Sequence, residues 1–294
     1  MPLIKKILSY TGITLYVFIL FLLMTFYRLP ADKLIAATME NLTKGRLLFK
    51  AENISPVLPT GYRLEEVSYG IFVGDTPAKD HFKSLTFGPD YREIFTGHLP
   101  IKFNGVMPRG NIHGKTGLSI LSRGKEGYLT IKASDVYLED LNILRSFSGR
   151  NFKGKLRGEI KLEGNLADLS KIYGKGYLSL EKGSIDTRIS IPGMETIPFK
   201  GIKLAFTIKD GKVILNNSKM DGPMFSGNFS GEIRLQEKIA QSQIMITARM
   251  SPGSLLENDQ LTSKLLAKIM KGNDSLVIKI GGNLNRPNIK WGKS

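Results

Sequence analysis

Cysteine is absent from the 294 residues. Its absence excludes disulfides, thiolate metal sites, iron–sulfur clusters and cysteine nucleophiles. Histidine is scarce as well: the only three are His81, His98 and His113, and none of them has the spacing of a zinc-binding helix. We therefore expect no metal site, and we expect burial and hydrogen bonds alone to hold the fold.

Catalytic motifs are missing too. No G-x-S-x-G nucleophile elbow occurs. The stretch 110–116 resembles a phosphate-binding loop, but only three residues separate its glycines where four are needed, and a strand-like alternation follows it. A hairpin turn is the better interpretation of this stretch. No basic helix or aromatic stacking motif indicates nucleic-acid binding. We expect neither a cofactor nor an enzymatic activity.

Acidic residues are few: 26 Asp and Glu stand against 42 Lys and Arg, and the formal net charge is +16. A basic surface is drawn to anionic lipid head groups, although it also serves solubility alone. Hydrophobic residues make up 41% of the chain and aromatic residues 9%. These values are too high for a disordered chain, so we expect a folded protein.

Residues 7–27 form an uncharged run of 21 residues, preceded by Lys5 and Lys6 and followed by Arg28. As a helix this run would span about 31 Å, close to the ~30 Å of a bilayer core. The alternatives are a cleaved signal peptide, which has a shorter apolar region and a small-x-small cleavage site, and a buried soluble helix. The sequence predicts a single transmembrane helix at 7–27, with residues 1–6 cytoplasmic and the remainder periplasmic.

Beyond this run, residues 28–45 are predicted to form an amphipathic juxtamembrane helix. Residues 46–294 alternate between apolar and polar side chains, as in strands with one face in water. Asp210-Gly211 lies between two such runs and predicts a hairpin, because both residues accept positive φ. Apolar residues at 138–147 and 261–269 recur at helical spacing, and we expect these two helices to cap the sheet.

The predicted fold class is mainly β. An elongated, curved antiparallel sheet, forming a half-barrel or groove, makes up a periplasmic domain at 46–294, with a candidate sub-boundary near 149–155 and a few short capping helices. The candidate apolar face of this sheet consists of Ile160, Leu162, Leu178, Leu180, Leu204, Phe206, Ile208, Ile233 and Leu235. A packed core is the ordinary expectation for such a face, and a lipid-binding trough is the alternative.

Four stretches carry a resemblance to known families: Gly154–Gly164, Gly174–Gly183, Ile197–Phe199 leading into Phe206–Val213, and Ile278–Ile289. The first three, with the ordering of anchor, helix and glycine-punctuated strands, resemble the GspN component of type II secretion systems in its delta-proteobacterial and spirochaete form. The last stretch is similar to the C-terminal signature of AsmA-type proteins, which are bacterial envelope proteins with long β-groove domains implicated in phospholipid handling. The resemblance implies a bacterial inner-membrane protein and names no catalytic residue.

Two functions remain open at this point. The first is a non-enzymatic accessory or assembly component of a type II protein secretion system, whose periplasmic domain contacts other secretion-apparatus proteins. The second is an AsmA-like module of the envelope that binds or transfers lipid or another hydrophobic ligand. The expected partners are thus the membrane, secretion proteins and phospholipid, and not nucleic acid.

Overall fold

The computed structural model describes residue 17 and residues 47–73, 76–92, 98–119, 126–166, 168–186, 195–236, 241–257, 275–284 and 286–292. Strands make up 75% of these residues, so the mainly β prediction is confirmed. All the strands belong to one antiparallel sheet, and the described helices are few and short.

The strands are β1 (Leu47–Lys50), β2 (Asn53–Val57), β3 (Gly61–Val73), β4 (Thr76–Pro89), β5 (His98–Val106), β6 (Asn111–Ser119), β7 (Gly127–Tyr137), β8 (Phe152–Gly164), β9 (Ile172–Asp186), β10 (Thr196–Lys209), β11 (Lys212–Asp221), β12 (Phe225–Arg234), β13 (Gln243–Pro252), β14 (Leu276–Asn283) and β15 (Arg286–Gly292). The helical elements are η2 (Leu138–Asp140), α3 (Asn142–Ser148), η3 (Leu169–Lys171) and α4 (Ser254–Glu257).

The chain runs through the sheet as a meander. From β3 to β15 each strand pairs with the next one in sequence, while β1 and β2 both pair with β3. Local turn chemistry explains why consecutive strands pair. Between β10 and β11, Asp210 has φ 52° and Gly211 has φ 68°, the backbone conformation that a tight two-residue hairpin requires. The hairpin predicted at these two residues is confirmed.

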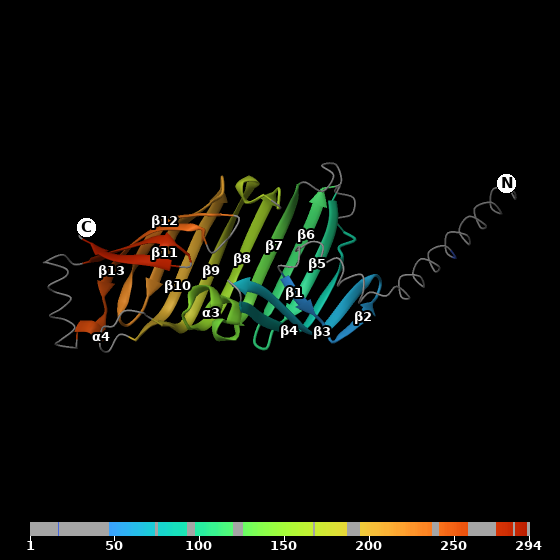
Figure 1. Ribbon diagram of the computed structural model, residues 1–294, viewed down its shortest axis with the longest axis horizontal. Helices are drawn as coiled ribbons and strands as arrows, with labels where there is room; N and C mark the ends of the chain where they lie inside the picture. The colour runs from blue at the N-terminus through green and yellow to red at the C-terminus, as the bar shows by residue number, and fades with distance from the viewer. Residues whose placement is uncertain are drawn as a thin grey trace.

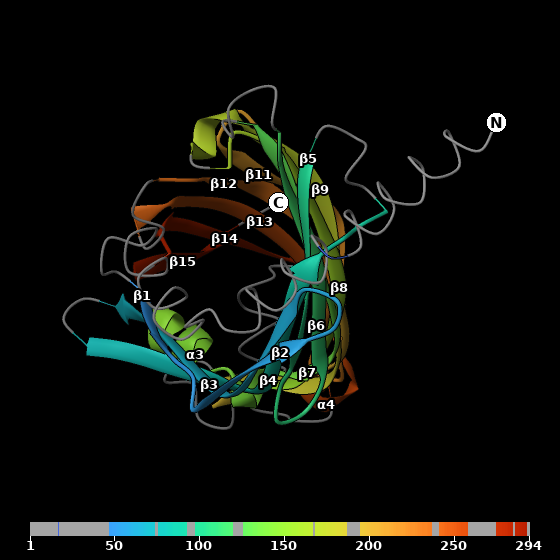
Figure 2. The same cartoon turned by 90° about the vertical axis from the view of Figure 1, so that its right-hand side faces the viewer.

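The sheet is curled, so that one face is concave and the other convex (Figure 2). The sheet is long in the direction that runs across its strands, and it does not close on itself (Figure 1). Three bulges accompany the curl, and each contains a non-glycine residue with positive φ: Asp135 on β7, Lys182 on β9 and Asn217 on β11. Because a bulge bends its strand and increases the local twist, these residues help to bend the sheet.

The helix predicted at 138–147 is present, but it is divided into η2 and α3. Leu141, which lies between the two, has φ −99° and ψ 85°, outside the helical region. Gly149 then ends α3 in the left-handed conformation with φ 62°, as a helix C-terminal glycine does. Strands β7 and β8 pair with one another on either side of this excursion, so the sheet continues through residues 149–155.

The predicted helices at 28–45 and 261–269 lie outside the described residues, and so does the predicted transmembrane run at 7–27 apart from Val17. In the part of the chain that the structure describes, no helix has the length and apolar character needed to cross a membrane.

Candidate functional site

The predicted apolar residues lie in one region of the sheet: Ile160 and Leu162 on β8, Leu178 and Leu180 on β9, Leu204, Phe206 and Ile208 on β10, Ile233 on β12, and Leu235 directly after β12. Residues that are directly paired across two strands point to the same face of a sheet. Leu178 pairs with Leu204, and Val213 of β11 pairs with both Ile208 and Ile233. Cross-strand pairing thus brings residues of four strands together in apolar rows.

These rows extend beyond the predicted set. On β7, Leu129 pairs with Leu162, and Ile131 pairs with Ile160. Further members lie on β11 and β13: Val213, Leu215, Ile244 and Ile246. The signal that could have found them is the same alternation, visible in Tyr128-Leu129-Thr130-Ile131. The apolar face therefore runs without a break from β7 to β13, and we call it the apolar rows.

Glycines take several positions in the apolar rows, each opposite a large side chain. Gly176 pairs with Phe206, and a Cβ added to Gly176 would lie 2.5 Å from the ring of Phe206. On the same face but outside the apolar rows, Gly114 of β6 pairs with Phe103 of β5 in the same manner. An aromatic ring lying over a cross-strand glycine covers the backbone there, so the apolar surface continues where no side chain is attached.

Apart from Ile244, which is 7% exposed, the apolar rows are neither exposed nor fully buried. All nine predicted residues are half-buried. Elsewhere the sheet has completely buried positions: Leu64 and Val67 on β3 are 0% exposed, Val136 on β7 is 1% exposed, and Leu138 in η2 is 6% exposed. Two of the described helices, η2 and α3, lie near these buried positions: α3 packs against β3 and β4, and η2 packs against β8. We call this part of the concave face, under η2 and α3, the covered part (Figure 2).

A carboxylate on the sheet holds α3 in place. The backbone N–H groups of Asn142 and Ile143, in the first turn of α3, donate to the two carboxylate oxygens of Asp80 on β4, at 2.6 and 3.1 Å. The residue preceding the helix, Leu141, offers no side-chain cap. Asp80 lies 62 residues before Asn142, so it does from the sheet what a capping residue ordinarily does from the chain itself.

Burial changes the acidity of this group. Asp80 is 4% exposed, and desolvation raises its pKa, although the two N–H donors from α3 act in the opposite direction. Burial and the nearby charge of Asp80 raise the pKa of Tyr69 to about 12. The Tyr69 ring stacks on Phe82 with 4.9 Å between the ring centroids. These contacts make α3 a fixed cover over β3 and β4.

The second element of the cover, η2, is held by charged groups. Arg109, in the turn between β5 and β6, donates to both carboxylate oxygens of Asp140, with distances of 2.9 and 2.6 Å. Its guanidinium lies 4.1 Å from the centroid of the Tyr137 ring. Glu139 accepts a hydrogen bond from the backbone N–H of Gly154, at 3.1 Å. These contacts connect the turn between β5 and β6, the η2 segment and the start of β8.

The other end of the sheet has its own packed cluster. Leu256 of α4 lies among the buried residues Met224, Phe225, Ala248, Met250 and Leu276. Backbone hydrogen bonds from Gly253 and Leu255 to the 223–224 turn hold α4 against β12 and β13. The apolar rows lie between this cluster and the covered part.

No group of three or more His, Asp or Glu side chains suited to a metal ion occurs in the described part of the chain. His81 and His113 are both exposed, on β4 and β6 respectively. No match to this chain was found among family models, curated proteins or solved structures. We take the apolar rows as the candidate site.

Proposed function

We propose that the apolar rows bind an elongated hydrophobic ligand, namely the acyl chains of a phospholipid. The role is that of a non-enzymatic lipid-binding or lipid-transfer module of the AsmA-like kind, held by the uncharged run at 7–27 in a bacterial inner membrane with its sheet in the periplasm. The observation that carries the proposal is that the apolar rows cross seven consecutive strands, β7 to β13, while their side chains, apart from the buried Ile244, stay half-buried.

A core that fills itself would look different. Interior side chains of proteins are closely packed and lose nearly all contact with solvent, as Leu64 and Val67 do. The apolar rows do not, although they consist of the same residue types. A contiguous apolar surface of more than a few hundred Å² is uncommon on a monomer and marks a site for a partner or ligand. The extended shape of the rows suits a chain-like ligand.

Site-specific photo-crosslinking tests the proposal. The full chain, in its native membrane, would carry benzoylphenylalanine in place of Phe206, and mass spectrometry would identify the adducts. We expect phospholipid adducts, joined through their acyl chains. The matched control replaces Ser230, an exposed residue on β12, because its side chain lies on the opposite face from the Gly231–Ile246 pair. Equal acyl-chain adducts at both positions, or none at Phe206, would overturn the proposal.

A second candidate is the accessory role in type II secretion that the resemblance implies. It is favoured by the open edge of the sheet: within the described residues, β15 pairs with β14 and with no other strand. An edge strand offers its unpaired backbone groups to a strand of another protein. Purification from native membranes tests this role. Identified secretion-apparatus proteins should accompany the chain, and their absence would count against it.

A further inference from the structure

Lysines on the convex face lie in a single line. Lys102 of β5 pairs directly with Lys115 of β6, and Lys161 of β8 pairs directly with Lys175 of β9. Thr130 of β7 connects the two pairs, since it is the partner of both Lys115 and Lys161. With strands about 4.8 Å apart, the four lysines span roughly 19 Å across five strands. We call these four residues the lysine row.

Such a line is unfavourable for the sheet itself, because like charges directly opposite one another destabilise paired strands. Neighbouring groups offset this repulsion between the lysines only in part. Lys161 lies 3.0 Å from Glu159, and Lys115 lies 5.6 Å from the centroid of the Tyr128 ring. In the described part of the chain, neither Lys102 nor Lys175 forms an ion pair. Strands β5 and β6 contain no acidic residue at all. The lysine row therefore keeps an excess of positive charge.

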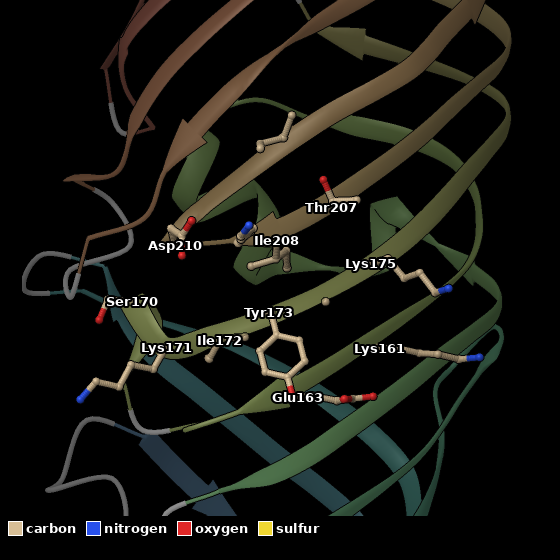
Figure 3. Close-up of a pocket in the computed structure, with 13 residues that line it drawn as sticks. Lys161, Glu163, Ser170, Lys171, Ile172, Tyr173, Lys175, Thr207, Ile208 and Asp210 are labelled. Carbon is tan, nitrogen blue, oxygen red and sulfur yellow. The ribbon is translucent and has the colours of Figure 1, made fainter.

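Exposed tyrosines accompany the lysines. Tyr173 and Tyr177 are 54% and 51% exposed, and they alternate with Lys175 along the same face of β9. Figure 3 shows Lys161 and Lys175 on neighbouring strands, directed to the same side, with Tyr173 near Glu163. The four residues Lys161, Glu163, Tyr173 and Lys175, together with the exposed Ile214, border a hollow of about 750 Å³. Tyrosine rings and lysine side chains are the groups that favour the boundary between a bilayer and water.

We propose that the lysine row docks the sheet on the surface of an anionic phospholipid bilayer. Charge complementarity supplies the attraction, and Tyr173, Tyr177 and Ile214 supply amphipathic contact area at the head-group level. As a membrane anchor, the uncharged run at 7–27 would keep the sheet close to a bilayer, which favours lipid over an acidic protein as the occupant. The proposal concerns the convex face and does not rest on acyl-chain binding by the apolar rows.

The lack of cysteine provides a clean test. A single Thr207→Cys substitution in the full chain, at the exposed residue that pairs with Lys175, accepts one fluorophore, and the labelled protein would be reconstituted into vesicles containing head-group spin-labelled lipid. We expect strong quenching in vesicles of mixed phosphatidylcholine and phosphatidylglycerol, weak quenching in phosphatidylcholine alone, and loss of quenching at high salt. Each lysine near an anionic surface strengthens docking about fivefold. Combining Lys102→Glu, Lys115→Glu, Lys161→Glu and Lys175→Glu should therefore reduce docking more than tenfold.

The matched control reverses four exposed lysines outside the row, namely Lys50, Lys83, Lys200 and Lys290, and so has the same net charge. Its quenching should stay within about twofold of the parent protein. An equal loss in both variants, or quenching that does not depend on phosphatidylglycerol, overturns the proposal. If the fourfold reversal prevents folding, as judged by circular dichroism, the same four lysines changed to Gln provide the comparison.

Discussion

Two parts of the concave face contain the same kinds of residue and differ in what lies over them. In the covered part, Leu64, Val67 and Val136 are almost completely buried, and α3 packs against β3 and β4 there. In the apolar rows, residues such as Leu178 and Val213 stay half-buried. Both parts are built by the same alternation and the same antiparallel pairing. The pattern of a strand therefore determines which side chains share a face, whereas the cover determines whether that face becomes a core.

The contacts that hold the cover, formed by η2 and α3, on the sheet are polar. Asp80 holds the first turn of α3, Arg109 holds η2 through Asp140, and Glu139 holds the backbone of Gly154. Hydrogen bonds to charged groups have stricter geometry than apolar contact. The cover is thus fixed in one position over β3, β4 and the start of β8, and it does not spread along the sheet.

The largest difference between the two parts should be seen on truncating a leucine. Leu64→Ala removes a completely buried side chain, and we expect it to lower the free energy of unfolding by about 3 kcal/mol, through lost burial and the cavity left behind. Leu178→Ala removes a half-buried side chain and should cost about 1 kcal/mol. Urea unfolding of the full chain in detergent, followed by circular dichroism, measures both. Equal losses would mean that the apolar rows are as well packed as the covered part.

An isosteric pair sharpens the comparison without creating a cavity. Val136→Thr places a hydroxyl at a position that is 1% exposed, and we expect a loss of about 2 kcal/mol, because a buried hydroxyl without a partner keeps its desolvation cost. Val213→Thr makes the same change in the apolar rows and should alter stability by less than about 0.5 kcal/mol. The same unfolding measurement applies, and a larger effect at Val213 than at Val136 would reverse our assignment of the two parts.

Sequence reasoning accounts for the features that depend on neighbours in the chain. Alternation correctly indicates the strands around Ile160 and Leu178, and Asp210-Gly211 correctly indicates a hairpin. Spacing also places a helix before Gly149. Each of these follows from two-residue or helical periodicity or from the φ that a turn requires.

The remaining features depend on register, which local patterns do not contain. Asp80 caps a helix 62 residues away, and no spacing rule connects the two. The lysine row exists only because five strands align with one another. The bulges place Asp135 and Lys182 at positive φ, a conformation in which glycine or asparagine is the usual residue. Whether the apolar rows become a core is decided by distant segments and not by the rows themselves.

Removing the helix cap should have a smaller effect than removing core volume. Asp80→Ala leaves two N–H groups of α3 without their acceptor, and we expect the free energy of unfolding to fall by about 1 kcal/mol. Hydrogen exchange of α3 amides, measured by mass spectrometry, should increase, while exchange in β10 and β11 should stay unchanged. Asp90→Ala, a change at a half-buried carboxylate in the turn after β4 that contacts no residue of α3, is the control. Uniform acceleration over the whole sheet would contradict a local role for Asp80.

The finest difference lies in how the covered part responds to pH. Burial raises the pKa of Asp80 above its ordinary value of 3.8, so the folded protein holds this proton more tightly than the unfolded chain does. Stability contributed by the protonated carboxyl is therefore complete below pH 3.8 and declines as pH rises through the folded pKa.

Replacing Asp80 by asparagine (Asp80→Asn) removes this dependence of stability on pH. The free energy of unfolding of the variant, minus that of the parent, should thus increase from pH 4 towards neutrality. Asp135 and Glu232, whose pKa values are lowered by Arg157 and Arg234 respectively, are common to both proteins and cancel in the difference. Parallel pH profiles would show that the carboxyl of Asp80 is not destabilised by its burial under α3.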